Sequence, residues 1–180
     1  MGPGLPFETD RLVLRAPSPD HAPALQEAIE ESFEALHPWM PWAVKLQTFE
    51  ETLDFLARSE RQFEADENYI VLGFLRESGR FVLGTGLHPR DRDVPSYEIG
   101  YWCRSSLQGN GYVVEAVNAL AALGLGLMGA RRLEIRCDAN NVASARVATR
   151  AGFEHEATLR RERVANDGTL SDTLIFAKLA

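Results

Sequence analysis

Two glycines, Gly109 and Gly111, lie directly before an apolar run with helical spacing in the stretch Leu-Gln-Gly-Asn-Gly-Tyr-Val-Val-Glu-Ala-Val at positions 107–117. A helix that begins there has backbone N–H groups without partners, and glycines let an anion approach those groups closely. The helix dipole also favours negative charge at that end. The stretch therefore predicts either a pyrophosphate site or a tight strand-to-helix turn that needs positive φ and binds nothing.

A second glycine set at 124–129, Gly-Leu-Gly-Leu-Met-Gly, has the spacing of the dinucleotide-binding fingerprint. That fingerprint needs a strand before it and a helix after it, whereas this set ends a helical run and precedes a strand. We interpret it as packing at a helix end, with Gly129 stopping the helix. We therefore expect no nicotinamide or flavin cofactor.

Cysteine and histidine spacing gives no sign of a metal site. Cys103 and Cys137 are too few for a disulfide framework and lack the neighbours of a zinc site. No base is adjacent to Cys103 in the sequence, so we interpret it as a strand residue and not as a nucleophile. The four histidines lie far apart: His21, His37, His88 and His155. We expect two reduced, buried thiols and no metal ion.

The bulk composition is that of one globular domain. The chain has 180 residues, of which 45% are hydrophobic and 25% charged, and 19 Lys and Arg against 26 Asp and Glu give a net charge of −7. This balance argues against nucleic acid as the main ligand and favours a small cationic substrate. No basic segment precedes an apolar one at the start, and no run approaches about 18 apolar residues. We therefore expect no membrane insertion and predict a cytoplasmic protein.

Hydrophobic periodicity divides the chain into strands and helices. Strands are predicted at 11–15, 69–75, 81–87, 97–104, 132–138, 153–160 and 170–178, and helices at about 20–32, 48–65, 111–127 and 141–151. Hairpin turns are predicted around Gly79 and at 166–168, Asn-Asp-Gly.

The element order is β-α-α-β-β-β-α-β-α-β-β, and its runs of consecutive strands exclude a regular doubly wound sheet. We predict an α+β fold with a mixed, mostly antiparallel twisted sheet and a parallel crossover only around the 111–127 helix. The chain should form a single domain over 1–180, with its core at about 8–179.

A further motif, Asp-Ala-Asn-Asn-Val-Ala-Ser-Ala-Arg-Val-Ala-Thr-Arg-Ala-Gly-Phe at 138–153, has a helix cap at Asn140 or Asn141 and a stop at Gly152. Together with ETDRLVLR, HPWMPW, YEIGYW and LQGNGYVVEAV in this order, it resembles the GNAT N-acetyltransferases, in particular the branch of ribosomal-protein N-terminal acetyltransferases. The resemblance extends from about Glu8 to Leu179.

This resemblance implies a fold with helices on both faces of the sheet and acetyl-CoA in a V-shaped opening between two splayed parallel strands, 97–104 and 132–138. It implies that the pyrophosphate lies on the backbone amides of Gln108, Gly109, Asn110, Gly111, Tyr112 and Val113. It further implies that backbone groups of Trp102, Cys103 and Arg104 pair with the pantetheine arm, and that Asn141 contacts the cofactor from the other side.

Two positions depart from the family pattern. Ser106 stands where many relatives carry Arg or Gln, so one side-chain contact to phosphate is missing. Ala148 stands where many members carry a Tyr that protonates the leaving thiolate. The resemblance still implies Glu98 as the general base, against a solvent-facing strand carboxylate, and Ser144 as the acid, against a hydroxyl that only orients the sulfur. A strand amide near Cys103 is the expected oxyanion donor.

The acceptor amine is the least determined part. Trp39 and Trp42, between prolines that exclude a helix, either pack against the sheet or line a pocket, and His37 beside them is a candidate for the same pocket. We expect specificity to depend on 34–50 and on the polar stretch 88–96. The predicted acceptor is a protein N-terminus, with a small amine or antibiotic as the alternative, and a non-catalytic acyl-CoA-binding module as the alternative from another class. The resemblance is also compatible with a homodimer.

Overall fold

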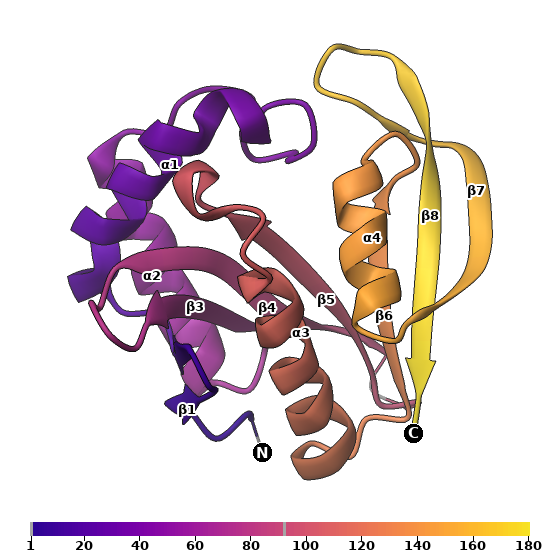
Figure 1. Cartoon of the computed structure of the whole chain (residues 1–180), viewed down its shortest axis with the longest axis horizontal. Helices are drawn as coiled ribbons and strands as arrows, with labels where there is room; N and C mark the ends of the chain where they lie inside the picture. The colour runs from indigo at the N-terminus through magenta and orange to yellow at the C-terminus, as the bar shows by residue number, and fades with distance from the viewer. Residues whose placement is uncertain (1, 92) are drawn as a thin grey trace.

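Eight strands form one open sheet, and helices cover both of its faces (Figure 1). The structure, a computed structural model, describes residues 2–91 and 93–180. The strands are β1 (Phe7–Glu8), β2 (Leu12–Arg15), β3 (Tyr69–Leu75), β4 (Phe81–Asp91), β5 (Ser96–Cys103), β6 (Arg132–Asp138), β7 (Glu154–Val164) and β8 (Leu170–Leu179). The helices are α1 (Ala22–Leu36), α2 (Phe49–Glu64), α3 (Tyr112–Ala122) and α4 (Val142–Arg150), with shorter helical segments η1 (Pro19–His21), η2 (Ser105–Leu107) and η3 (Leu123–Leu127).

The strand order is β1-β2-β3-β4-β5-β6-β8-β7, and β5 with β6 is the parallel pair. These two strands pair only between 96–98 and 132–134, whereas β4 follows β5 from Ser96 to Cys103 and β8 follows β6 along its whole length. β5 therefore stays paired with β4, and β6 with β8, while β5 and β6 separate from each other beyond residues 98 and 134. The predicted α+β sheet with its parallel crossover around α3 is confirmed.

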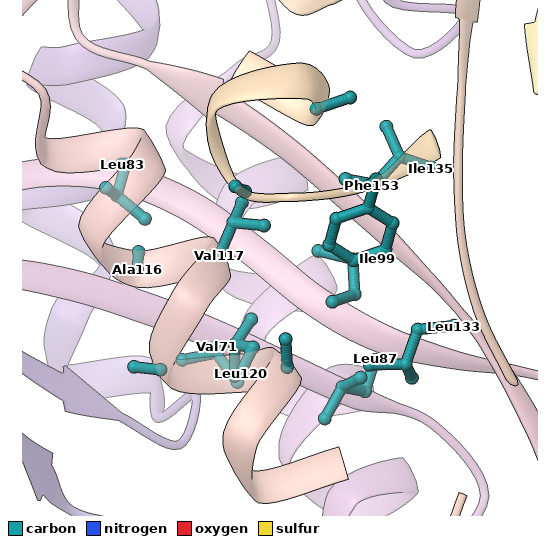
Figure 2. Packing of buried hydrophobic residues seen from close by; sticks show 14 of the residues in the cluster. Val71, Leu83, Leu87, Ile99, Ala116, Val117, Leu120, Leu133, Ile135 and Phe153 are labelled. Carbon is teal, nitrogen blue, oxygen red and sulfur yellow. The ribbon is translucent and has the colours of Figure 1, made fainter. Parts of the chain in front are cut away.

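Two apolar clusters hold the helices on opposite faces of the sheet. On one face, α3 and α4 pack against the middle of the sheet, as Figure 2 shows for Val117 and Leu120 of α3 beside Ile99 and Leu133 of neighbouring strands. On the other face, α1 and α2 pack on a smaller cluster that contains Leu72. Since successive strand residues point to opposite faces, the apolar runs in β3 and β4 serve both clusters.

Local signals in the sequence explain where several elements begin and end. Thr48 and Glu51 form a capping box at the start of α2. The helix predicted to run to residue 127 is α-helical only to Ala122 and then continues as one π-helical turn. A Cβ at Gly124 in this turn would lie 3.2 Å from Leu133, so the glycine allows close approach to β6. Gly129 follows with φ 65°, in agreement with its predicted role as the stop.

Two strands are longer than predicted, and both extensions matter for the site. β4 continues to Asp91 and β7 to Val164, so part of the polar stretch 88–96 belongs to the sheet, while Arg92 lies outside the described residues. Within the described residues, no helix is long and apolar enough to cross a membrane. The same residues contain no group of three or more His, Cys, Asp or Glu side chains that could hold a metal ion.

Candidate active site

A cavity of about 1090 Å³ opens where β5 and β6 separate, and it is lined from both faces of the sheet. On the α3/α4 face its wall includes the loop before α3 and one side of α4. On the α1/α2 face it includes Glu98, the turn after α1 and the end of β7. The cavity therefore extends through the gap in the sheet. We call its two parts the α3/α4 chamber and the α1/α2 chamber, after the helices on each face.

The loop before α3 has the geometry of an anion site. Gly109 and Gly111 have φ of 79° and 81°, and no side chain caps the helix at Gly111. The Asn110 side chain donates to Leu107 O and Gln108 O at 3.1 Å and so closes the loop on itself. The turn needs the positive φ of both glycines, and it places the first amides of α3, which have no partner within the helix, beside the cavity.

Five of the six residues predicted from the loop line the cavity: Gln108, Gly109, Gly111, Tyr112 and Val113. Within the described residues, the cavity wall does not include Asn110, whose side chain is occupied in the loop. The loop predicted as an anion cradle therefore lies at the cavity, and the Asn110 side chain braces it.

Two arginines of α4, which we did not single out from the sequence, line the same cavity as the loop. Arg146 and Arg150 both line the cavity and are exposed, and α4 begins at Asn141, whose Oδ1 accepts from Ser144 N at 3.0 Å. Among the described residues neither guanidinium has an ion-pair partner. Their i, i+4 spacing places them on one helix face, which was the available signal. They supply positive charge to the wall of this cavity.

The register of β4 and β5 decides which backbone groups of β5 are available. Arg104 N donates to Val82 O at 2.8 Å, and hydrogen-bonded pairs alternate along an antiparallel ladder. Trp102, paired with Gly84, therefore also turns its backbone toward β4. The backbone groups of Tyr101 and Cys103 face the opening instead. Of the three predicted pantetheine partners, Cys103 turns its backbone groups toward the opening, as does Tyr101, whereas Trp102 and Arg104 turn theirs toward β4.

The Arg104 side chain, for which we predicted no role, links β5 to α1. It is 4% exposed and pairs with Glu27 and with Glu31 of α1. Glu31 also accepts from Ser106 N at 2.9 Å. These bonds, first of all the one from Arg104, hold the pKa of Glu31 at about 2. Arg104 therefore ties α1 to the segment that leads into the anion loop.

Glu98 lies in β5 on the α1/α2 face, at the cavity wall. Its carboxylate is 3.5 Å from Arg90 Nη1, and its side chain is 26% exposed. Burial raises the pKa of Glu98, Arg90 and Arg136 oppose this shift, and the carboxylates Glu134 and Glu162 add to it. A carboxylate with a raised pKa is a stronger base than an exposed one.

Tyr101 and Ser144 form a hydroxyl pair on the α3/α4 face of the opening. Tyr101 Oη donates to Ser144 O at 2.8 Å, and Ser144 Oγ donates to Tyr101 Oη at 3.1 Å. Burial raises the pKa of Tyr101, so its hydroxyl stays protonated. Ala148, where the family tyrosine is missing, is fully buried in the core. The motif YEIGYW contains Tyr101. Only the register of β5 shows which face of the strand its side chain occupies.

The residues expected to hold the acceptor are divided by the fold. Trp39 lines the cavity. His37 and Trp42 are not part of the described cavity wall: His37 Nδ1 bonds to Ala43 O at 2.8 Å, and Trp42 packs edge-on against Trp102 with ring centroids 5.8 Å apart. Both residues shape and anchor the turn that carries Trp39. Burial also raises the pKa of Cys103 to about 11, which agrees with an inert thiol.

The arrangement can bind an anionic chain on one face and present a base on the other. The α3/α4 chamber has free amides, Arg146 and Arg150. The α1/α2 chamber has Glu98, with the arginines near it already paired to carboxylates. This is the geometry for transfer of an acyl group through the sheet to an amine.

Comparisons with known proteins agree with this geometry. The family described as "Acetyltransferase (GNAT) domain" matches residues 11–154. The ribosomal-protein-serine acetyltransferase of Escherichia coli (strain K12) is 26% identical over 182 residues, which cover 95% of this chain and 94% of that protein. The putative ribosomal N-acetyltransferase YdaF of Bacillus subtilis (strain 168) is 26% identical over 151 residues, which cover 84% of this chain and 82% of that protein.

Two solved structures share the fold closely. The ribosomal L7/L12 α-N-protein acetyltransferase RimL in complex with coenzyme A superposes with a TM-score of 0.89 at 24% identity over 97% of both chains. The microcin C7 self-immunity acetyltransferase MccE in complex with acetyl-CoA and AMP gives 0.88 at 23% identity over 96% of this chain and 94% of its own. With a family match over most of its length and a through-sheet cavity of this kind, the chain belongs to the GNAT acetyltransferase family.

Proposed function

We propose that the protein transfers the acetyl group of acetyl-CoA to the α-amino group of a protein, as the ribosomal-protein acetyltransferases among its relatives are named for doing. The observation that carries this proposal is the cavity through the sheet, with an anion site on one face and Glu98 on the other. An acyl donor and an amine can reach the gap between β5 and β6 without competing for one space.

The α3/α4 chamber fits acetyl-CoA by its chemistry. The uncapped start of α3 and the amides of 109–113 suit a pyrophosphate, and Arg146 and Arg150 add two cations beside it. The backbone of Tyr101 and Cys103 offers strand-like hydrogen bonds to the amides of the pantetheine arm. Asn141 lines the same chamber at the start of α4. Bound there, acetyl-CoA supplies the activated acetyl group and a thiolate leaving group.

Glu98 acts as the general base in this proposal. An amine attacks only in its neutral form, so an ammonium must lose a proton first. Glu98 accepts this proton directly or through one water, and its raised pKa brings it closer to the working pH. General-base catalysis of this kind typically contributes about 10²–10⁴-fold in rate.

The other charges are handled on the α3/α4 face. The N–H of Cys103, which faces the opening, donates to the carbonyl oxygen as negative charge develops on it. The Ser144 hydroxyl turns from Tyr101 to the departing sulfur, and Tyr101, held protonated by burial, keeps Ser144 in place. Tyr101 thus compensates for the absence of the tyrosine that many family members carry at the position of Ala148. Holding donor and amine side by side contributes up to roughly 7–11 kcal/mol of the acceleration.

The decisive experiment measures thiol release from acetyl-CoA with peptides that carry a free α-amine, with small amines, and with no acceptor. We expect turnover with the peptides and a loss of about 10²–10⁴-fold in kcat/KM for Glu98→Gln. Glu77→Gln, which removes the same charge from an exposed turn, is the control and should leave turnover unchanged. Tight acetyl-CoA binding without thiol release for any acceptor would overturn the proposal.

Two coarser properties also belong to the proposal. Since ribosomal proteins are the acceptors for which the relatives are named, we place the protein in the cytoplasm, which fractionation of cells tests directly. We retain the homodimer as a prediction. Light scattering on the purified chain over a range of concentrations decides it.

A further inference from the structure

The wall of the α1/α2 chamber includes three arginines, Arg90, Arg136 and Arg163. Two of them are paired with carboxylates of the same wall. Arg90 Nη1 lies 3.5 Å from Glu98 Oε2, and Arg136 Nη2 lies 2.9 Å from Glu162 Oε1. Within the described residues, the Arg163 guanidinium forms no ion pair. Its charge is therefore the one that this wall leaves unmatched.

Two further acids line the cavity, and neither is paired with Arg163. Asp138 is 4% exposed, and its Oδ1 accepts from Asn140 N at 2.8 Å. Glu34 lies exposed near the end of α1, where water screens its charge. The positive charge of Arg163 thus remains available to a ligand.

Most of the hydrogen-bond donors of Arg163 are also free. The residue is half-buried, and its Nη2 donates to Trp39 O at 3.3 Å. This is the one hydrogen bond of its side chain within the described residues. A guanidinium has five N–H donors in a planar fork that matches a carboxylate. The single bond holds the group at the chamber wall and leaves the other donors for an anion.

A bulge in β7, the last strand of the sheet (Figure 1), accompanies this placement. The register between β7 and β8 shifts between Leu159 and Arg163, and Arg161 has φ 52°, a left-handed conformation that is uncommon outside glycine. Arg161 N donates to Asp172 Oδ1 at 2.8 Å, which fixes the bulge. Bulges re-aim the side chains near them, and here Arg163 lies in the cavity wall on an otherwise exposed strand.

The sheet places Arg163 a short way from the candidate base. Glu98 is level with Glu134 in the register of β5 and β6, and Arg136 follows two residues further along β6. Arg136 binds Glu162, the neighbour of Arg163 in β7. Since an extended chain rises about 3.3 Å per residue, these steps correspond to a few residues of a bound peptide.

We propose that Arg163 is a specificity-determining residue that binds the carboxylate of an acidic side chain at the second, third or fourth residue of the acceptor protein. The α-amino group then lies at Glu98 while the acid close behind it pairs with Arg163. The net charge of −7 favours basic acceptors at long range, so this preference comes from the local contact alone. The inference rests on the proposed function, since it specifies the acceptor of that reaction.

The first experiment uses wild-type protein, acetyl-CoA and linear peptides with a free α-amine. The peptides of each pair differ in one residue, glutamate or glutamine, at the second, third or fourth position. We expect kcat/KM to be at least about tenfold higher for the glutamate peptide at one of these positions. The difference should lie in the KM for the peptide, because the contact is made equally before and during transfer. Equal values for all three pairs overturn the inference.

Reversing the charge tests the contact directly. Arg163→Glu should disfavour the glutamate peptide and favour the same peptide with lysine at that position, a reversal that a merely structural role does not produce. Arg163→Gln keeps an N–H donor for Trp39 O and should abolish the preference, so it serves if Arg163→Glu does not fold. A folded variant that keeps the wild-type preference overturns the inference.

Arg160→Gln is the matched control, because it removes the same charge from the same strand. Arg160 is exposed and is not part of the described cavity wall. Arg160→Gln should keep the preference of wild type for the glutamate peptide. An equal loss in both glutamine variants would assign the preference to the overall charge of the protein and overturn the local contact.

Two further readouts separate the inference from a contact with the donor and from the proposed function. A rise in the KM for acetyl-CoA in Arg163→Gln, without the same rise in Arg160→Gln, would place Arg163 on acetyl-CoA and overturn the inference. Absence of thiol release with every α-amine peptide sinks the proposed function. Turnover that does not distinguish glutamate from glutamine sinks only the acidic-residue site.

Discussion

Replacing Arg146 and Arg150 of α4 by glutamine should weaken the use of acetyl-CoA without lowering turnover at saturation. Both guanidinium groups are exposed, line the α3/α4 chamber and have no ion-pair partner among the described residues, so their charge is available to a phosphate. They belong to α4, which packs on the other face of the sheet from Glu98. Loss of a contact made equally in the ground and transition states raises KM and leaves kcat unchanged.

The size of the effect follows from exposure. An exposed ion pair contributes about 1 kcal/mol at most, which corresponds to about 5-fold in affinity. Two contacts of this kind that add independently give about 30-fold in the KM for acetyl-CoA. Because exposed charges are screened over about 8 Å at physiological ionic strength, high salt should shrink the difference between wild type and variant.

The assay is thiol release at a saturating concentration of peptide, with acetyl-CoA or acetyl-dephospho-CoA varied. If the arginines contact the 3′-phosphate, the penalty of the double variant disappears with acetyl-dephospho-CoA; if they contact the pyrophosphate, it remains. The control is Arg58→Gln with Arg61→Gln, which removes two exposed charges from α2 on the other face. A double variant whose KM changes no more than that of this control refutes the assignment of the α4 arginines to phosphate.

Three further predictions concern the opening and the anion loop. Arg90→Gln removes a cation that lowers the pKa of Glu98, so this pKa should rise. The acidic limb of the pH profile of kcat/KM should then move to higher pH. No movement, or a shift to lower pH, would count against Glu98 as the base. Tyr101→Phe removes the hydrogen-bond partner of Ser144 and should lower kcat more than it raises the KM for acetyl-CoA. A kcat equal to that of wild type in rapid-quench assays would show that the pair has no role in the departure of the thiolate. Gly109 has φ 79°, with open space where a Cβ would lie. Gly109→Ala should therefore cost about 1 kcal/mol in the free energy of unfolding, through backbone strain, and should weaken acetyl-CoA binding. An unchanged denaturation midpoint would show that the loop tolerates the side chain.

Features that depend on a few neighbouring residues were predictable from the sequence, whereas features that depend on the alignment of strands were not. Local patterns predicted every strand except β1, the four main helices and the loop before α3, because hydrophobic periodicity and glycine conformation act over a few residues. They did not predict which backbone groups of β5 face the opening. That choice depends on the register of β4 against β5, and a one-residue shift would exchange Tyr101 and Cys103 for Trp102 and Arg104.

The same distinction applies to the acceptor residues. His37, Trp39 and Trp42 lie in one short segment and have similar chemical promise in the sequence. In the structure, Trp39 faces the cavity, while the other two fix the turn through Ala43 O and Trp102. A turn without regular periodicity gives no indication of which side its residues face.

By itself, the sequence determined the family, the order of strands and helices, the glycine loop and the candidate base, because these follow from residue type and from spacing along the chain. The tertiary structure alone decided that Arg146 and Arg150 line the same cavity as that loop, that Tyr101 is paired with Ser144, and that Asn166 binds the turn after α1. Each of these contacts joins segments whose separation in the chain has no relation to their separation in space. They depend on how β6 leaves β5 and which way β7 turns, and such geometry is set by the packing of the whole sheet.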